Sequence, residues 1–196
     1  MTFTVRRAAL IVAAALFATA LTQVFYITVV SNAEGQLLRR ITWVSEMALF
    51  TIPAVVGIVL AARDRFNPLA WAAIAFGSMV NLLQVGMGLS MFGPAQESAD
   101  PAVFQSILQG AFFLYFHGKA LFGLAAIGFG IAALKGGGLS KAIGALGILS
   151  GLAAAILNLL GMANGMDIVQ MAGGAGTVAT AVLAILIAMT VRDPVD

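Results

Sequence analysis

Six apolar stretches, each about twenty residues or longer, dominate this chain and constrain what it can fold into. An α-helix rises about 1.5 Å per residue, so about 20 apolar residues cross the roughly 30 Å of hydrocarbon in a bilayer. Lipid offers no hydrogen-bond partner to an exposed backbone, and each stretch is therefore predicted to be a transmembrane helix. The stretches cover residues 8–30, 41–62, 69–92, 111–134, 142–162 and 168–191.

The composition agrees with a membrane location. Of the 196 residues, 61% are hydrophobic and 9% are charged, and the mean hydropathy is +1.04. Soluble domains carry about 25% charged residues, so we expect the lipid bilayer to be the partner of this surface. The net charge of +2 comes without a basic face, which excludes a nucleic-acid-binding protein.

Short links between the stretches predict that neighbours in sequence pack antiparallel. We expect an all-α fold, a compact bundle of six transmembrane helices that forms a single domain over residues 1–196. The longer link, Gly93–Gln109, contains Pro94 and Pro101 and is predicted to hold a short helix at the membrane surface. Trp43 and Trp71 lie near the ends of their stretches, where tryptophan favours the membrane–water interface.

The distribution of basic residues predicts the orientation. Lysine and arginine accumulate in cytoplasmic segments. With a cytoplasmic N-terminus, seven of them flank the spans on the cytoplasmic side and two, Arg39 and Arg40, lie on the other side. We therefore expect a multi-pass protein with both termini in the cytoplasm. The seven are Arg6, Arg7, Arg63, Arg65, Lys135, Lys141 and Arg192.

The first stretch also has features of a signal peptide. Arg6-Arg7 precedes an apolar run, and Ala18-Thr19-Ala20 resembles a small-residue cleavage site. The apolar run continues to Val30, which is long enough to span a bilayer. The sequence favours a retained transmembrane helix.

Ionisable residues within the stretches are the strongest functional signal. Each costs about 2.5–3.5 kcal/mol at mid-bilayer on insertion scales. Glu46 and Lys119 both fall in the non-cytoplasmic half, with most of the span amides, whereas the cytoplasmic half is almost purely apolar. This asymmetry predicts a polar pocket open to the non-cytoplasmic side. The residues predicted to line it are Glu46, Lys119, His117, Asn81, Gln84, Asn158 and Tyr115.

The fourth stretch places its polar residues on two faces. At 100° per residue, Tyr115 and Lys119 share a face and His117 lies about 160° from Lys119. We expect Lys119 to pair with Glu46 across the bundle, with Tyr115 nearby. The same pair could instead serve only to fix helix register.

Nothing in the sequence indicates catalysis. There is no cysteine and one histidine, which excludes thiolate metal sites, iron–sulfur clusters and histidine clusters. No nucleophile with its base, no paired carboxylates and no phosphate-binding glycine loop are present. No catalytic residue, metal site or cofactor is therefore predicted, although His117 and a methionine could in principle ligate haem.

From the second stretch onward the sequence resembles a bacterial family of six-helix integral membrane proteins known only as a domain of unknown function. The resemblance rests on three features: Glu46 after Arg39-Arg40, Phe116-His117-Gly118, and the basic link from Lys135 to Gly144. The chain departs from the family at Ser140, where a proline is expected. This resemblance implies a six-helix protein of the bacterial inner membrane and carries no activity.

Three functions remain open from the sequence. The first is an inner-membrane protein that binds, senses or transports a small molecule or an ion through the polar pocket. The second is a structural or assembly subunit, with a membrane-protein partner or a second copy of the chain. The third is a quinone- or haem-binding redox protein, suggested by His117, Tyr115 and the neighbouring phenylalanines.

Overall fold

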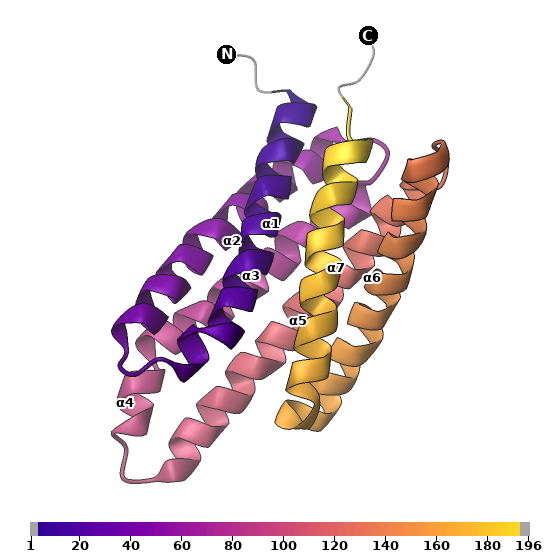
Figure 1. Cartoon of the computed structure of the whole chain (residues 1–196). Coiled ribbons are helices and arrows are strands. Elements are labelled where there is room, and N and C mark those ends of the chain that lie inside the picture. The colour runs from indigo at the N-terminus through magenta and orange to yellow at the C-terminus, as the bar shows by residue number, and fades with distance from the viewer. Residues whose placement is uncertain (1–3, 193–196) are drawn as a thin grey trace.

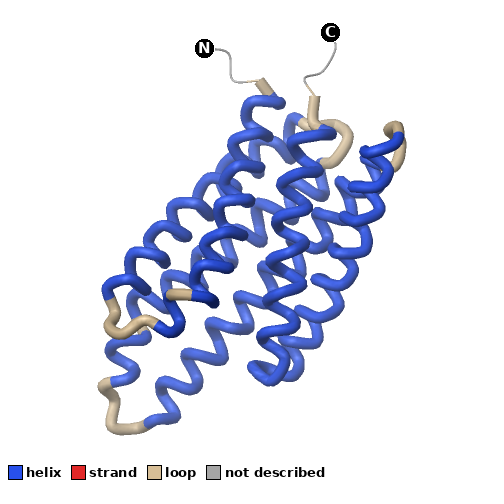
Figure 2. The backbone as a smooth tube through the Cα atoms, in the orientation of Figure 1, coloured by secondary structure: helices blue, strands red, loops and turns tan. Residues whose placement is uncertain are grey.

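The computed structural model describes residues 4–192, and all its regular elements in that range are helices, as predicted (Figures 1 and 2). The long helices are α1 (Val5–Thr28), α2 (Leu37–Arg63), α3 (Pro68–Ser90), α5 (Pro101–Ala133), α6 (Gly138–Asn164) and α7 (Val169–Thr190). The short ones are α4 (Phe92–Gln96) and the 3-10 turns η1 (Val30–Asn32) and η2 (Gly165–Ile168).

Five segments of the described chain are long and apolar enough to cross a membrane, and the protein is a multi-pass membrane protein. Four of them correspond to α1 with η1, to α2, to α3 and to α5. The fifth, Gly138–Thr190, contains 53 residues and includes both α6 and α7. These two helices lie antiparallel, and Asn158 on α6 donates a hydrogen bond to the carbonyl of Ala172 on α7 at 2.9 Å (Figure 1).

The helix bounds follow the apolar stretches except at the link between α3 and α5. The predicted short helix in this link is confirmed as α4. The predicted extent of the link, Gly93–Gln109, is wrong, because α5 begins at Pro101 and includes the second half of the link. The reason is local: the Asp100 carboxylate accepts a hydrogen bond from the Ala102 amide at 2.9 Å, and proline suits the first helical turn.

Five helices form a closed ring, and the sixth packs outside it. Around the ring α1 packs against α2, α2 against α3, α3 against α5, α5 against α7, and α7 against α1. Helix α6 covers the groove between α5 and α7 (Figure 1). Side chains that point inward therefore come from five helices and meet in the middle of the ring.

Paired glycines bring α5 and α6 close together. A Cβ atom at Gly123 would lie 2.7 Å from the carbonyl oxygen of Gly151, and one at Gly130 would lie 2.8 Å from that of Gly144. Small residues allow this approach between membrane helices, where apolar burial supplies little drive for association. The backbone contact therefore holds α6 on the outside of the ring.

The two ends of the bundle differ in charge. We call the end where α1 begins and α7 ends the basic end, and the opposite end, with η1, α4 and η2, the distal end (Figure 1). The helix order places the seven predicted cytoplasmic lysines and arginines at the basic end, and Arg39 and Arg40 at the distal end. Glu34, Glu97, Asp100 and Asp167 are also at the distal end.

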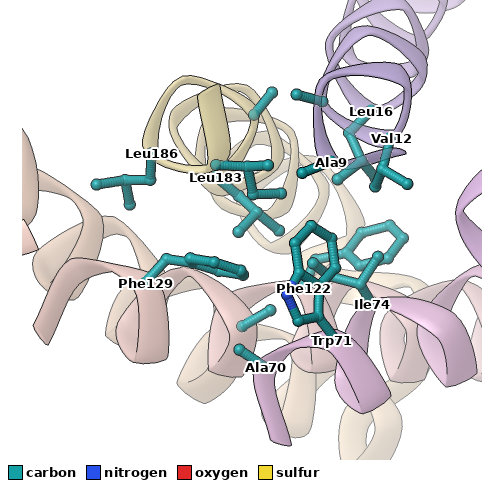
Figure 3. Packing of buried hydrophobic residues seen from close by; sticks show 14 of the residues in the cluster. Ala9, Val12, Leu16, Ala70, Trp71, Ile74, Phe122, Phe129, Leu183 and Leu186 are labelled. Carbon is teal, nitrogen blue, oxygen red and sulfur yellow. The ribbon is translucent and has the colours of Figure 1, made fainter. Parts of the chain in front are cut away.

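An apolar core fills the half of the ring near the basic end (Figure 3). Trp71 of α3 contacts Phe129 of α5 edge to face, with ring centroids 5.1 Å apart, and Val12 and Leu16 of α1 close the core from the other side. Trp71 is 0% exposed and lies in the first turn of α3, so its ring is covered by protein close to the end of its span. Its indole nitrogen donates to buried Asp64, which lets the ring lie inside the bundle.

Candidate functional site

Lys119 of α5 lies in the middle of the ring and is 0% exposed. Its ammonium group donates a hydrogen bond to Oε1 of Gln23 on α1. The aliphatic part of the side chain crosses α7 at Gly176, where an added Cβ would lie 2.8 Å from Lys119 Cβ. Because glycine leaves this space, a long cation fits between α1 and α7.

Thr177 of α7 completes the surroundings of Gln23. Its hydroxyl lies 2.9 Å from Oε1 of Gln23 and 2.8 Å from the carbonyl of Gly173, and its one hydrogen can bond either acceptor. The Gln23 carbonyl oxygen thus lies within reach of donors from two helices, α5 and α7.

Glu46 of α2 is 6% exposed and faces α1. Its carboxylate accepts a hydrogen bond from the Thr22 hydroxyl at 3.1 Å. Thr22 and Gln23 are consecutive residues, so one turn of α1 touches Glu46 with one residue and Lys119 with the next. We call Thr22, Gln23, Glu46, Lys119 and Thr177 the buried polar cluster.

The expected direct ion pair is wrong. Lys119 and Glu46 make no contact within 4.0 Å, and each is instead hydrogen bonded to a neutral side chain of α1. The reason is the ring geometry, because α2 and α5 are not neighbours in the ring and α1 supplies the side chains that contact Glu46 and Lys119.

The prediction that Tyr115 and Lys119 share one face of the fourth stretch, and that His117 lies on another, is confirmed. Tyr115 lies one turn before Lys119 on the same face, and its ring centroid is 5.6 Å from the Lys119 ammonium nitrogen. His117 faces away and packs between the rings of Phe76 and Phe113, at centroid distances of 6.0 and 6.5 Å. Both phenylalanines are exposed on the outside of the bundle, so His117 does not join the cluster.

The three predicted amides are also outside the cluster. Asn81 of α3 donates to the carbonyl of Gly77 on its own helix at 2.7 Å and lies at the contact with Gly118 of α5. Asn158 connects α6 to α7. Both side chains are buried, and among the described residues their amide oxygens have no hydrogen-bond partner. Gln84 is half-buried, and its side chain makes no hydrogen bond within the described residues.

The structure thus brings together Glu46, Lys119 and Tyr115 of the predicted residues and adds Thr22, Gln23 and Thr177. The sequence contained a signal for the additions, since Thr22, Gln23 and Thr177 belong to stripes of small and polar residues on their helices. Such stripes usually mark helix packing, and spacing within one helix does not tell which stripe meets a charge.

Comparison with protein-family models, with curated proteins and with solved structures found no match. Within residues 4–192, no three histidine, cysteine, aspartate or glutamate residues gather as a group that could hold a metal ion. The function must therefore be inferred from the cluster itself, which presents an ammonium group, a carboxylate, an amide and hydroxyl groups inside the membrane-embedded part of the protein.

Proposed function

We propose that this chain is a six-span protein of the bacterial inner membrane that binds a small polar molecule or an ion at the buried polar cluster. Sensing and transport would both begin with this binding step. The antiparallel packing of α6 and α7 supports six spans, and the excess of basic residues at one end supports a cytoplasmic basic end.

The observation that carries the proposal is the separate burial of two opposite charges. Each charge in a membrane costs about 2.5–3.5 kcal/mol, and a direct pair would offset more of this cost than two bonds to neutral side chains. A lysine ammonium has three donors, yet among residues 4–192 Lys119 has one hydrogen-bond acceptor, Gln23. Two opposite charges held apart in this way favour a site where a ligand or an ion binds between them over a purely structural contact between helices.

The distribution of polar groups supports access from the distal end. Thr22 and Gln23 lie in the last two turns of α1 before that end, and Glu46 lies nine residues after the start of α2. The half of the ring beyond them is the apolar core. A ligand that enters from the distal side therefore meets the cluster before it meets the apolar core.

Cysteine accessibility tests this proposal directly, because the chain contains no cysteine of its own. We expect Thr22→Cys to react with a membrane-impermeant methanethiosulfonate applied from outside the cell. Ala13→Cys is the matched control on the same helix, because Ala13 is buried in the apolar core, and it should stay unreactive.

Charge variants then test whether the cluster faces the accessible space. Lys119→Met should lower the rate of an anionic reagent at Thr22→Cys relative to a cationic one by about tenfold, and Glu46→Gln should shift the ratio the other way. Lys135→Met, an exposed change at the basic end, should leave the ratio unchanged.

The proposal is wrong if Thr22→Cys is as unreactive as Ala13→Cys in a folded protein. The cluster would then be a dry packing contact, as expected for a structural or assembly subunit. Size-exclusion chromatography of each variant in detergent establishes that an unreactive cysteine is not the result of misfolding.

A further inference from the structure

A cavity of about 270 Å³ lies at the distal end, where α2 begins and α3 runs into α4. Its lining includes Arg39, Arg40, Trp43, Gly88, Phe92 and Glu97. None of these residues belongs to the buried polar cluster.

One wall of the cavity is strongly positive. Arg39 and Arg40 are in the first turn of α2, and the N-cap residue of that helix, Gln36, makes no side-chain capping bond. A helix N-terminus is itself positive, so arginine in the first turn is electrostatically unfavourable unless an anion is nearby. The Nε atom of Arg39 is buried and has no hydrogen-bond partner in the part of the chain that the structure describes. This wall has the donors for a carboxylate or a phosphate group.

Aromatic and acidic groups complete the lining, with Trp43 one turn after Arg39 on α2 and Glu97 after α4. Trp43 contacts Phe92 edge to face at a centroid distance of 5.8 Å and stacks on Tyr26 at 6.2 Å. An added Cβ at Gly88 would lie 3.1 Å from the indole ring, so Trp43 is held against the backbone of α3. Glu97 follows α4 and makes no ion pair with either arginine within 4.0 Å. Aromatic faces and a carboxylate together bind ammonium groups.

We propose that this cavity binds a small zwitterion, with its anionic group on Arg39 and Arg40 and its ammonium group on Glu97 and the ring of Trp43. The volume suits a molecule of the size of an amino acid. A free zwitterion and the phosphoethanolamine headgroup of a bilayer lipid share this chemistry, and the cavity lies at the end of the spans, where both occur. The inference is independent of the buried polar cluster and of ligand binding there.

Tryptophan fluorescence of the full chain in detergent tests this site. The chain has two tryptophans: Trp43 lines the cavity, and Trp71 is buried in the apolar core. We expect glycine to change the emission in a saturable way, and Trp43→Phe to abolish the change. Acetate, which lacks the ammonium group, and methylammonium, which lacks the carboxylate, should bind at least about tenfold more weakly.

Two charge variants assign the two ends of the ligand. Arg39→Gln should weaken glycine binding about tenfold, and Glu97→Gln should make glycine and acetate bind equally. Arg63→Gln, at an exposed arginine of the basic end, is the matched control and should bind glycine like the wild type. Arg39→Lys keeps the charge, so it provides a folded variant if Arg39→Gln is unstable.

Nanodiscs distinguish the two sources of the zwitterion. If the ligand is a headgroup, the emission of Trp43 should differ between nanodiscs with phosphatidylethanolamine and nanodiscs with phosphatidylglycerol alone, and Glu97→Gln should remove the difference. A response to glycine in detergent indicates a free zwitterion. Equal binding of acetate and glycine by the wild type, or no response to either glycine or phosphatidylethanolamine, would overturn the proposal.

Discussion

At the scale of single residues, Asp64 connects the turn between α2 and α3 to the apolar core at the basic end of the bundle. Its carboxylate accepts hydrogen bonds from the Phe66 amide at 2.9 Å and from the Trp71 indole nitrogen at 2.7 Å. The first bond shapes the turn between α2 and α3. The second gives a partner to the indole N–H of Trp71, the largest fully buried side chain. A buried donor that loses its acceptor keeps its full desolvation cost.

We predict that Asp64→Ala lowers the free energy of unfolding by about 1–3 kcal/mol, because the Trp71 N–H is then buried without a partner. Unfolding in mixed detergent micelles, followed by circular dichroism, measures the change. Trp71→Phe removes the donor, so Asp64→Ala should cost clearly less in that background. Equal costs in the two backgrounds would show that the hydrogen bond contributes nothing.

The cluster illustrates what a residue pattern can and cannot predict. Glu46 and Lys119 were identifiable because a charged side chain in a membrane span is expensive and therefore rarely incidental. Their partners were not identifiable, because contact between Lys119 and Gln23 joins residues 96 positions apart in the chain. Helical periodicity orders residues within one helix only, and it correctly separated His117 from Lys119 for that reason.

At the scale of helices, the approach of α5 to α6 depends on glycine at four positions. The close contacts are reciprocal: a Cβ at Gly151 would lie 2.6 Å from the carbonyl of Gly123, and a Cβ at Gly123 would lie 2.7 Å from the carbonyl of Gly151. Neither carbonyl can move without a shift of its helix. The same arrangement recurs seven residues along each helix, at Gly130 and Gly144.

We predict that Gly123→Ala destabilises the protein by about 1–3 kcal/mol, as overpacking of a close contact does. The matched control is Gly174→Ala on α7, because no atom lies within 4 Å of the Cβ it would add. This control should be neutral or stabilising by up to about 1 kcal/mol, since alanine loses less backbone entropy than glycine in a helix. Thermal unfolding of both variants in detergent measures the difference, and similar melting temperatures would contradict the close packing.

The bounds of the helices were predictable where hydropathy changes at a helix end. They were not predictable at the start of α5, because residues 101–110 are less apolar than the rest of that helix. In this segment the Asp100 cap and the position of Pro101 decide the helix start. Local capping therefore extends α5 beyond the stretch that lipid alone would define.

At the scale of the whole molecule, the charge difference between the ends makes a prediction about topology. We expect Asn32→Cys in η1 and Asp167→Cys in η2 to react with a membrane-impermeant maleimide on intact cells. Gly137→Cys, in the link between α5 and α6, should react only after permeabilisation, because it lies at the basic end.

The two distal positions test different parts of this topology. Asn32 reports the orientation of α1 and α2, whereas Asp167 reports whether α6 and α7 cross the membrane as separate spans. Labelling of Gly137→Cys in place of the other two would mean that the basic end is outside. An unlabelled Asp167→Cys together with a labelled Asn32→Cys would contradict six spans.

The sequence by itself determined that this is an all-helical membrane protein, because about 20 apolar residues in a row have one stable structure in lipid. It also located the two charged residues within the spans. Only the tertiary structure decided that Trp71 is buried, that α6 lies outside a five-helix ring, and that Gln23 and Thr22 separate Lys119 from Glu46. The physical reason is that membrane helices associate through close packing and hydrogen bonds between distant segments, and these interactions depend on which helix faces meet.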